Sequence, residues 1–272
     1  MKKNINEWKP MTTFLSYLAI VIIARAIIGY AYSAEMNAGW IHIIDFFLYL
    51  SPAFAAWAAE KGNFSKFCSH NKLTFKNISW KASISYVAAT ACLFPLLAML
   101  LIYVGGNLLN VETIGHISIP SHNDFSYMGI PIVDNSYLRI VQLWGIITGY
   151  ALIVGSTLGA LSVIAEEIGW RGFMENHLRC SNIFKPVLIG LVWTLWGIPF
   201  WIFGNGQDCF SILWKVSSLL LYNIVLSFYL SKVQRNTNSL WTSAMVRGVL
   251  TFCTLSAIYV PADENGSLCV SL

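Results

Sequence analysis

Apolar runs of about 20 residues recur along this chain, and they limit the folds that it can adopt. Of its 272 residues, 56% are hydrophobic and only 11% are charged, whereas about a quarter of the residues in a soluble globular domain carry a charge. A run of roughly 20 apolar residues spans a bilayer as a helix, in which each backbone polar group finds a partner. The composition therefore predicts an all-α, polytopic integral membrane protein.

Seven runs have the length and composition of membrane spans. The first is interpreted as a retained span, not a cleaved signal peptide, because it is long, contains Arg25 and lacks a small-residue cleavage site. The runs divide the chain into N-terminal spans with an outer loop (1–137), a helical core (138–260) and a short acidic tail (261–272). The seven predicted spans are residues 12–31, 41–59, 82–104, 138–164, 184–203, 211–231 and 239–260.

The charges of the loops predict the orientation of the spans. Lysines and arginines gather at the N-terminus and in alternate loops, and the opposite loops carry acidic residues. Because basic loops stay on the cytoplasmic side, we expect a cytoplasmic N-terminus and an external C-terminus. The last four residues, beginning at Cys269, have the C-a-a-X form of a prenylation signal. An external tail lies beyond the reach of a cytosolic prenyltransferase, so we interpret this tetrapeptide as a chance pattern.

Membrane lipid is the partner that the composition predicts most directly, and nucleic acid is not expected. The formal net charge of +4 is small and spread over several loops. Residues 64–80 mix aromatic side chains with lysines, which fits either an interfacial helix on anionic lipid or an ordinary basic loop. Two charges at membrane depth, Arg25 and Asp45, are expected to form a structural ion pair between neighbouring helices.

Two adjacent glutamates, Glu166 and Glu167, follow the apolar run 138–164. Ionisable groups at membrane depth are costly unless they are paired or hydrated, and they are therefore candidates for function. If the helix continues, Glu167 and Arg171 lie one turn apart and can form an ion pair. Glu166 points about 100° away around the helix axis. This arrangement predicts one carboxylate held by a partner and one left free to face a cavity.

This stretch resembles the first motif of the CPBP family, which comprises type II CAAX prenyl proteases and bacteriocin-processing or self-immunity (Abi) membrane proteins. The motif is Glu166-Glu167-x-x-x-Arg171, extended by Gly169-Trp170-Arg171-Gly172. The frames Trp193-x-x-x-Gly197-x-Pro199 and Ser239-Leu240-Trp241…Arg247-x-x-x-Thr251 align with the second and third motifs. The resemblance covers about residues 155–255 and implies a helical protein of the bacterial plasma membrane.

Three motif positions depart from the family pattern. Gly197 stands where the second motif has a histidine, Arg247 where the third has a histidine, and Thr251 where the third has asparagine or aspartate. In the family, the first glutamate and the second-motif histidine activate water, and the third-motif residues stabilise the oxyanion. The resemblance implies that Glu166 is the base and Arg171 its structural support. The candidate site residues are Glu166, Glu167, Arg171, Arg247 and Thr251.

Peptide hydrolysis without a covalent nucleophile needs a base and an electrophilic clamp for the oxyanion. Arg247 has two interpretations: it can clamp an oxyanion, or it can neutralise Glu166 or Glu167 and close the site. None of the five histidines lies in the last three predicted spans, and only His177 lies close to the motif in sequence. Without HExxH or CxxC spacing, the sequence predicts no metal and no cofactor. We expect His116 and His122, in the long outer loop, to be solvated.

The sequence therefore leaves three functions to compare. We predict a divergent CPBP membrane protein, with weak or no peptidase activity, that binds a membrane peptide or a partner protein in an immunity or scaffold role. The alternative is an active, glutamate-dependent intramembrane endopeptidase that processes membrane-associated peptides. A small transporter is the third interpretation, but the chain lacks the repeated broken helices that such proteins use.

Overall fold

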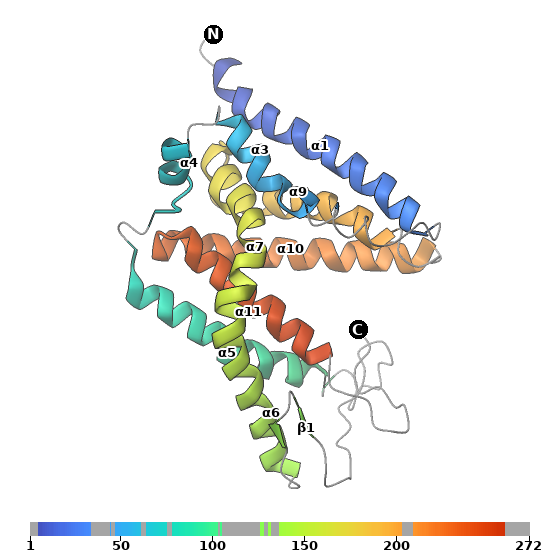
Figure 1. The fold of residues 1–272 in the computed structure, drawn as a ribbon, viewed down its shortest axis with the longest axis vertical. Helices are drawn as coiled ribbons and strands as arrows, with labels where there is room; N and C mark the ends of the chain where they lie inside the picture. Colours follow the sequence, from blue (N-terminus) through green and yellow to red (C-terminus); the bar gives the residue numbers. More distant parts are fainter. Residues whose placement is uncertain are drawn as a thin grey trace. The chain divides into compact units, whose positions relative to one another are not determined.

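A computed structural model describes residues 5–33, 44, 47–60, 64–74, 78–102, 104, 126–127, 130–131, 136–202 and 209–258. Asp45, His116, His122 and the acidic tail lie outside these residues. The elements are α1 (Ile5–Ser33), α3 (Ser51–Ala59), α4 (Phe64–His70), α5 (Trp80–Ile102), β1 (Ser126–Tyr127), β2 (Ile130–Pro131), α6 (Ser136–Tyr150), η3 (Ala151–Gly159), α7 (Ala160–Glu167), η4 (Ile168–Met174), α8 (Glu175–His177), α9 (Phe184–Ile202), α10 (Cys209–Thr237) and α11 (Leu240–Ile258) (Figure 1).

The described secondary-structure elements are helices apart from a short antiparallel ladder between β1 and β2, which confirms the predicted all-α class. Four helices are long and apolar enough to cross a membrane. They overlap the first, third, fourth and sixth predicted spans and indicate an integral membrane protein. The four segments are Lys9–Tyr30, Trp80–Ala98, Val141–His177 and Ile212–Thr237.

The predicted number of seven spans is not confirmed. The apolar helices Phe184–Pro199 and Leu240–Cys253 are shorter than the four long segments. The second predicted span contains α3, which has 9 residues. A helix rises 1.5 Å per residue and needs about 20 residues to cross a hydrocarbon core of about 30 Å. Length alone therefore does not establish these three segments as full spans.

The chain forms two compact units, and each combines two stretches of sequence. The first unit comprises Met1–Ser79 and Val163–Ser243, and the second comprises Trp80–Ser162 and Ala244–Leu272. Within the first unit, α9 packs along α10, and α1 lies against both α3 and α9 (Figure 1). The segment η4 packs against α3, α9 and α10. The Glu-Glu motif is therefore enclosed by helices from both ends of the sequence of this unit.

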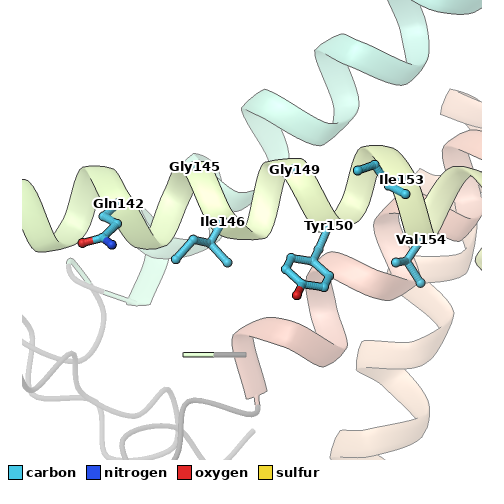
Figure 2. Close-up of a pocket in the computed structure, with 7 residues that line it drawn as sticks. All are labelled: Gln142, Gly145, Ile146, Gly149, Tyr150, Ile153 and Val154. Carbon is cyan, nitrogen blue, oxygen red and sulfur yellow. The ribbon is translucent and has the colours of Figure 1, made fainter. Parts of the chain in front are cut away.

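Within the second unit, α5 packs against α6 and η3 around a small apolar core. The helix η3 approaches the α11 residue Gly248 closely, because a Cβ atom on Gly248 would lie 2.3 Å from the carbonyl oxygen of Gly155. A hollow of about 760 Å³ runs along the same helical stretch (Figure 2). The residues that line it are Gln142, Gly145, Ile146, Gly149, Tyr150, Ile153 and Val154.

Among the described residues of the basic segment 64–80, α4 is helical and Trp80 begins α5. After α4 the chain turns at Lys72, whose φ is 55°. Trp241, from the third-motif frame, donates its indole N–H to the carbonyl oxygen of Leu73 at 2.9 Å. Ser239 begins α11 by accepting the backbone N–H of Thr242 at 3.3 Å, as an N-cap serine does. Two residues of this frame thus have structural roles.

Glycines of the first motif allow close packing between helices. A Cβ atom on Gly169 would lie 2.5 Å from Cβ of Pro52 on α3, and one on Gly172 would lie 2.7 Å from Oδ1 of Asn71. Pro52 is tolerated there because it occupies the first turn of α3, where its missing N–H is not needed. At Gly197, in contrast, an added Cβ atom would meet only Leu219 Cδ2, at 3.7 Å.

We predict that Gly169→Ala lowers the free energy of unfolding by about 1–3 kcal/mol, because the new methyl group collides with Pro52. Thermal unfolding in detergent measures this loss as a lower Tm. Gly197→Ala is the matched control. Its methyl group has space, and the helix propensity of alanine is higher by up to about 1 kcal/mol. Equal stability of the two variants would contradict the close approach of η4 to α3.

Candidate functional site

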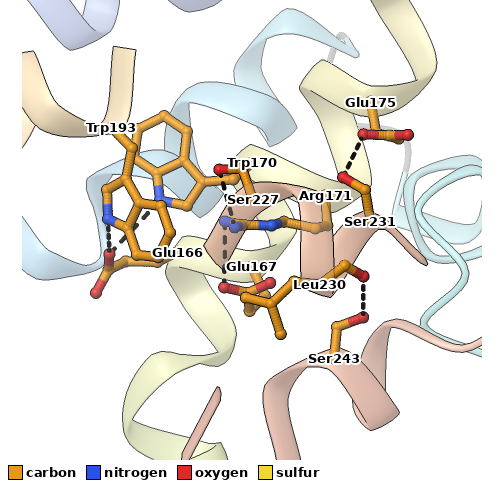
Figure 3. A network of polar contacts seen from close by, with 10 residues as sticks. All are labelled: Glu166, Glu167, Trp170, Arg171, Glu175, Trp193, Ser227, Leu230, Ser231 and Ser243. Carbon is orange, nitrogen blue, oxygen red and sulfur yellow. Dashed lines mark hydrogen bonds and ion pairs between the residues drawn. The ribbon is translucent and has the colours of Figure 1, made fainter. Parts of the chain in front are cut away.

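Glu167 on α7 and Arg171 on η4 form a fully buried ion pair (Figure 3). Nη1 of Arg171 lies 3.5 Å from Oε1 of Glu167, one helical turn earlier. Nη2 of Arg171 donates to the hydroxyl of Ser227 on α10 at 3.3 Å. The guanidinium carbon lies 4.5 Å from the ring centroid of Trp193 on α9, within cation–π range. The predicted pairing of Glu167 with Arg171 is confirmed, and it joins three helices.

Glu166 is also buried, with 4% of its surface exposed. Its Oε2 atom accepts the indole N–H of Trp193 at 3.0 Å and, at the limit of hydrogen bonding, that of Trp170 at 3.5 Å (Figure 3). The prediction that Glu166 is left free, without a partner, is wrong. Trp170 lies one turn further along the same helical run, and close packing of η4 against α9 brings Trp193 to the same oxygen.

Aromatic rings surround the carboxylate of Glu166 and its two indole partners. Trp170 is fully buried, and its ring centroid lies 6.5 Å from that of Trp193 and 5.9 Å from that of Trp196. From α1, Phe14 packs edge-to-face on Trp170 with ring centroids 6.3 Å apart. Rings of this size exclude water and hold one another in place. The carboxylate of Glu166 is therefore placed in an environment fixed by tryptophans.

The hydrogen-bond partners of Glu166 restrict the chemistry that it can support. An indole nitrogen donates a hydrogen bond and cannot accept one, whereas an imidazole does both. Trp193 and Trp170 can therefore hold the carboxylate but cannot relay a proton to or from water. Gly197 follows Trp193 by one turn on the same face of α9 and supplies no side chain at all. The second-motif position thus contributes no proton-transfer group.

Arg25, on α1, is buried at membrane depth in contact with aromatic rings. Its guanidinium carbon lies 4.6 Å from the ring centroid of Tyr49 and 4.3 Å from that of Trp196. Nη1 donates to the carbonyl oxygen of Trp196 at 3.4 Å. The indole of Trp196 in turn donates to the hydroxyl of Ser51 at 3.3 Å. The predicted partner Asp45 lies outside the described residues, so that ion pair stays a prediction.

Glu175 extends the charged face and was missed in the sequence interpretation. Its Oε2 accepts the hydroxyl of Ser231 at 2.9 Å (Figure 3). Its Oε1 lies 3.6 Å from Nη1 of Arg235. Burial lowers the pKa of Lys72, and the charge of Glu175 opposes that shift. A sequence pattern could have identified Glu175, because Glu167, Arg171 and Glu175 follow one another at four-residue intervals along one helical face.

Two further candidate residues belong to the second unit. Arg247 and Thr251 are on α11 in the second unit, Arg247 buried and Thr251 half-buried. Their predicted roles beside Glu166 stay predictions. His177 follows Glu166 by three helical turns, about 16 Å along the axis at 1.5 Å per residue. Its Nδ1 lies 2.9 Å from the carbonyl oxygen of Phe173. His177 therefore does not replace the second-motif histidine beside Glu166.

Residues 140–253 match the family model described as "Type II CAAX prenyl endopeptidase Rce1-like". The matched segment contains the Glu-Glu motif, the Trp193 to Pro199 frame and the third-motif frame through Thr251. The resemblance predicted from the motifs is confirmed over this segment. Neither the curated proteins nor the solved structures contain a significant match to the chain.

We predict that Arg171→Met destabilises the protein by about 3–5 kcal/mol, because it leaves the Glu167 carboxylate buried without its cation. Adding Glu167→Gln should recover much of that loss, and thermal unfolding of the two single variants and the double variant measures the coupling. Arg235→Met is the matched control. The side chain of Arg235 is 39% exposed in its pair with Glu175, so water partly screens this pair, and its removal should cost less than removal of the fully buried Arg171. Additive effects of Arg171→Met and Glu167→Gln would contradict the pairing.

Proposed function

We propose that this chain, in which residues 140–253 match the Rce1-like family model, is a divergent CPBP-type membrane protein with weak or no peptidase activity. Its proposed role is to bind a membrane peptide or a partner membrane protein, as an immunity or scaffold protein does. The observation that carries this proposal is the hydrogen bond of 3.0 Å from the indole of Trp193 to the Glu166 carboxylate.

Loss of hydrolysis follows from the proton-transfer groups around Glu166. A general base must contact the water that it activates, within about 2.6–3.2 Å. Oε2 of Glu166 already accepts two indole donors, and neither indole can take a proton. Gly197 supplies no imidazole to orient a water molecule. The groups described around Glu166 therefore hold the carboxylate in place. They do not supply the histidine that, in the family chemistry, acts with the glutamate to activate water.

Binding is supported by what the first unit retains. The Glu167–Arg171 pair, the contact of Arg171 with Ser227 and the aromatic rings preserve the helix packing of the motif segment. A preformed helical frame with aromatic and arginine side chains is a common basis of protein and peptide recognition. This helix packing does not depend on a catalytic histidine, so it can support binding without one.

An active endopeptidase is the second candidate function, and a specific observation favours it. The chain keeps Glu166 beside a buried Glu167–Arg171 pair, which is the part of the family site that would position a base. In that case a water molecule would displace one indole from Glu166 when substrate binds. Local rearrangement of this kind is compatible with catalytic contacts that tighten only in the complex.

We further propose that the N-terminus is cytoplasmic and the C-terminus external, which the loop charges support. Tags at the N-terminus and near Arg235 are then expected to be protected from external protease in intact cells. Tags near Asp124 and after Asp263 are expected to be cleaved. A protected tag after Asp263 would overturn the proposed orientation of the last helix, and with it the number of spans.

The proposed function predicts binding without turnover. Purified protein in lipid nanodiscs is titrated against fluorescent membrane peptides, including a farnesylated peptide that ends in a C-a-a-X sequence. We expect saturable binding by at least one peptide, measured by fluorescence anisotropy, with its mass unchanged after long incubation. Glu166→Gln keeps the shape of the side chain and should bind the same peptide with an affinity within about threefold. Absence of binding across the panel, or product formation by the wild type, would contradict the proposal.

A further inference from the structure

Glu60, His70 and His177 come together at the ends of three helices within the first unit. Glu60 caps the C-terminus of α3, His70 is the last residue of α4, and His177 is the last residue of α8. One ligand atom from each residue lies within 4.8 Å of the other two. This cluster is separate from the Glu166 network, since His177 follows Glu166 by about 16 Å along the helix.

The spacing of the three ligand atoms is close to that of a tetrahedral metal site. With metal–ligand bonds of about 2.0–2.1 Å, neighbouring ligand atoms lie about 3.3 Å apart. Nδ1 of His70 lies 2.8 Å from Oε1 of Glu60, and no pair in the cluster exceeds 4.8 Å. A shift of about 1.5 Å or less in each pair reaches the tetrahedral spacing. Side-chain rotation at helix ends supplies movements of this size.

His177 is oriented as a metal-binding histidine. Its Nδ1 lies 2.9 Å from the carbonyl oxygen of Phe173, which can only accept a hydrogen bond. Nδ1 therefore carries the proton, and Nε2 keeps its lone pair. The ring also stacks on that of Phe173, with centroids 4.0 Å apart. Hydrogen bonding of one ring nitrogen to a carbonyl is the support that metal-bound histidines usually have.

Glu60 gives an independent indication of a cation. Its side chain is only 4% exposed, and within the described part of the chain its Oε2 atom is buried without a hydrogen-bond partner. A buried carboxylate oxygen without a partner is costly, and a coordinated cation removes that cost. Asn71 and Asn176 support the cluster, through Nδ2 contacts to Oε1 of Glu60 at 3.4 Å and to the carbonyl oxygen of His70 at 2.9 Å.

We propose that Glu60, His70 and His177 form a binding site for a divalent transition-metal ion of the zinc class. Two imidazoles and one carboxylate are the ligand set that zinc accepts, with water in the fourth position. Calcium and magnesium favour oxygen ligands, so two histidines select against them. The ion would join the ends of α3, α4 and α8, which makes it a structural clamp and not a part of the Glu166 site. Sequence reasoning missed this cluster because its residues come from three separate segments.

The test uses the full-length protein, purified with a tag that contains no histidines and stripped of metal with a chelator. Zinc is titrated in competition with a chromophoric chelator, and cobalt is titrated with detection of its visible absorption. We expect one tight equivalent of either ion and a rise in Tm with zinc, because binding to the folded state stabilises it. His70→Ala, His177→Ala and Glu60→Gln should each weaken binding by at least about tenfold and reduce the rise in Tm.

His116→Ala and His122→Ala are the matched controls, because each removes one histidine and leaves Glu60, His70 and His177 intact. They should leave the affinity for zinc and cobalt unchanged. Glu60→Gln keeps the size of the side chain, so it tests the ligand role even if a histidine variant unfolds. The proposal is overturned if no stoichiometric binding occurs, or if His177→Ala and Glu60→Gln bind like the wild type. A Tm that responds to pH but not to zinc would also overturn it, because the cluster would then bind a proton and not a metal.

Discussion

The buried ion pair between Glu167 and Arg171 is the interaction on which the candidate site depends. It occupies a fully buried position, where one charge without the other costs several kcal/mol. Arg171 also contacts Ser227 on α10 and the ring of Trp193 on α9. A single guanidinium thus fixes the register of η4 against two helices. Placement of the neighbouring Glu166 follows from that register.

The described hydrogen-bond donors to Glu166 are tryptophans, whereas the family chemistry pairs the first glutamate with a histidine. The indole of Trp193 approaches Glu166 from α9, and Gly197 lies one turn further along the same helix. An indole at Trp193 and a glycine at position 197 are compatible with helix packing, but neither can accept a proton as an imidazole does. Under the proposed function, the chain retains the framework of the family site but not its chemistry. Similar frameworks with different sites are common, because function resides in particular side chains and not in the fold.

Local sequence patterns predicted the features that depend on residues only a few positions apart in one helix. The all-helical membrane fold follows from composition, and the Glu167–Arg171 pair follows from a spacing of four residues. The partner of Glu166 could not be predicted this way, because Trp193 is 27 residues away and reaches it only through the packing of α9 on η4. The 9-residue length of α3 was also hidden in the sequence, since hydropathy does not show where a helix ends. The cluster of Glu60, His70 and His177 depends on three helix ends meeting, which no single spacing encodes.

The central claim is that the Glu166 site holds its carboxylate without activating water. Incubation of membrane peptides with purified protein in ¹⁸O-labelled water tests this claim most directly, because hydrolysis transfers the label to a new carboxylate that mass spectrometry detects. We predict that the wild type and Glu166→Gln incorporate label at the same background rate, and that Gly197→His raises incorporation in the presence of Glu166 only. Label incorporation by the wild type that Glu166→Gln abolishes would contradict the account.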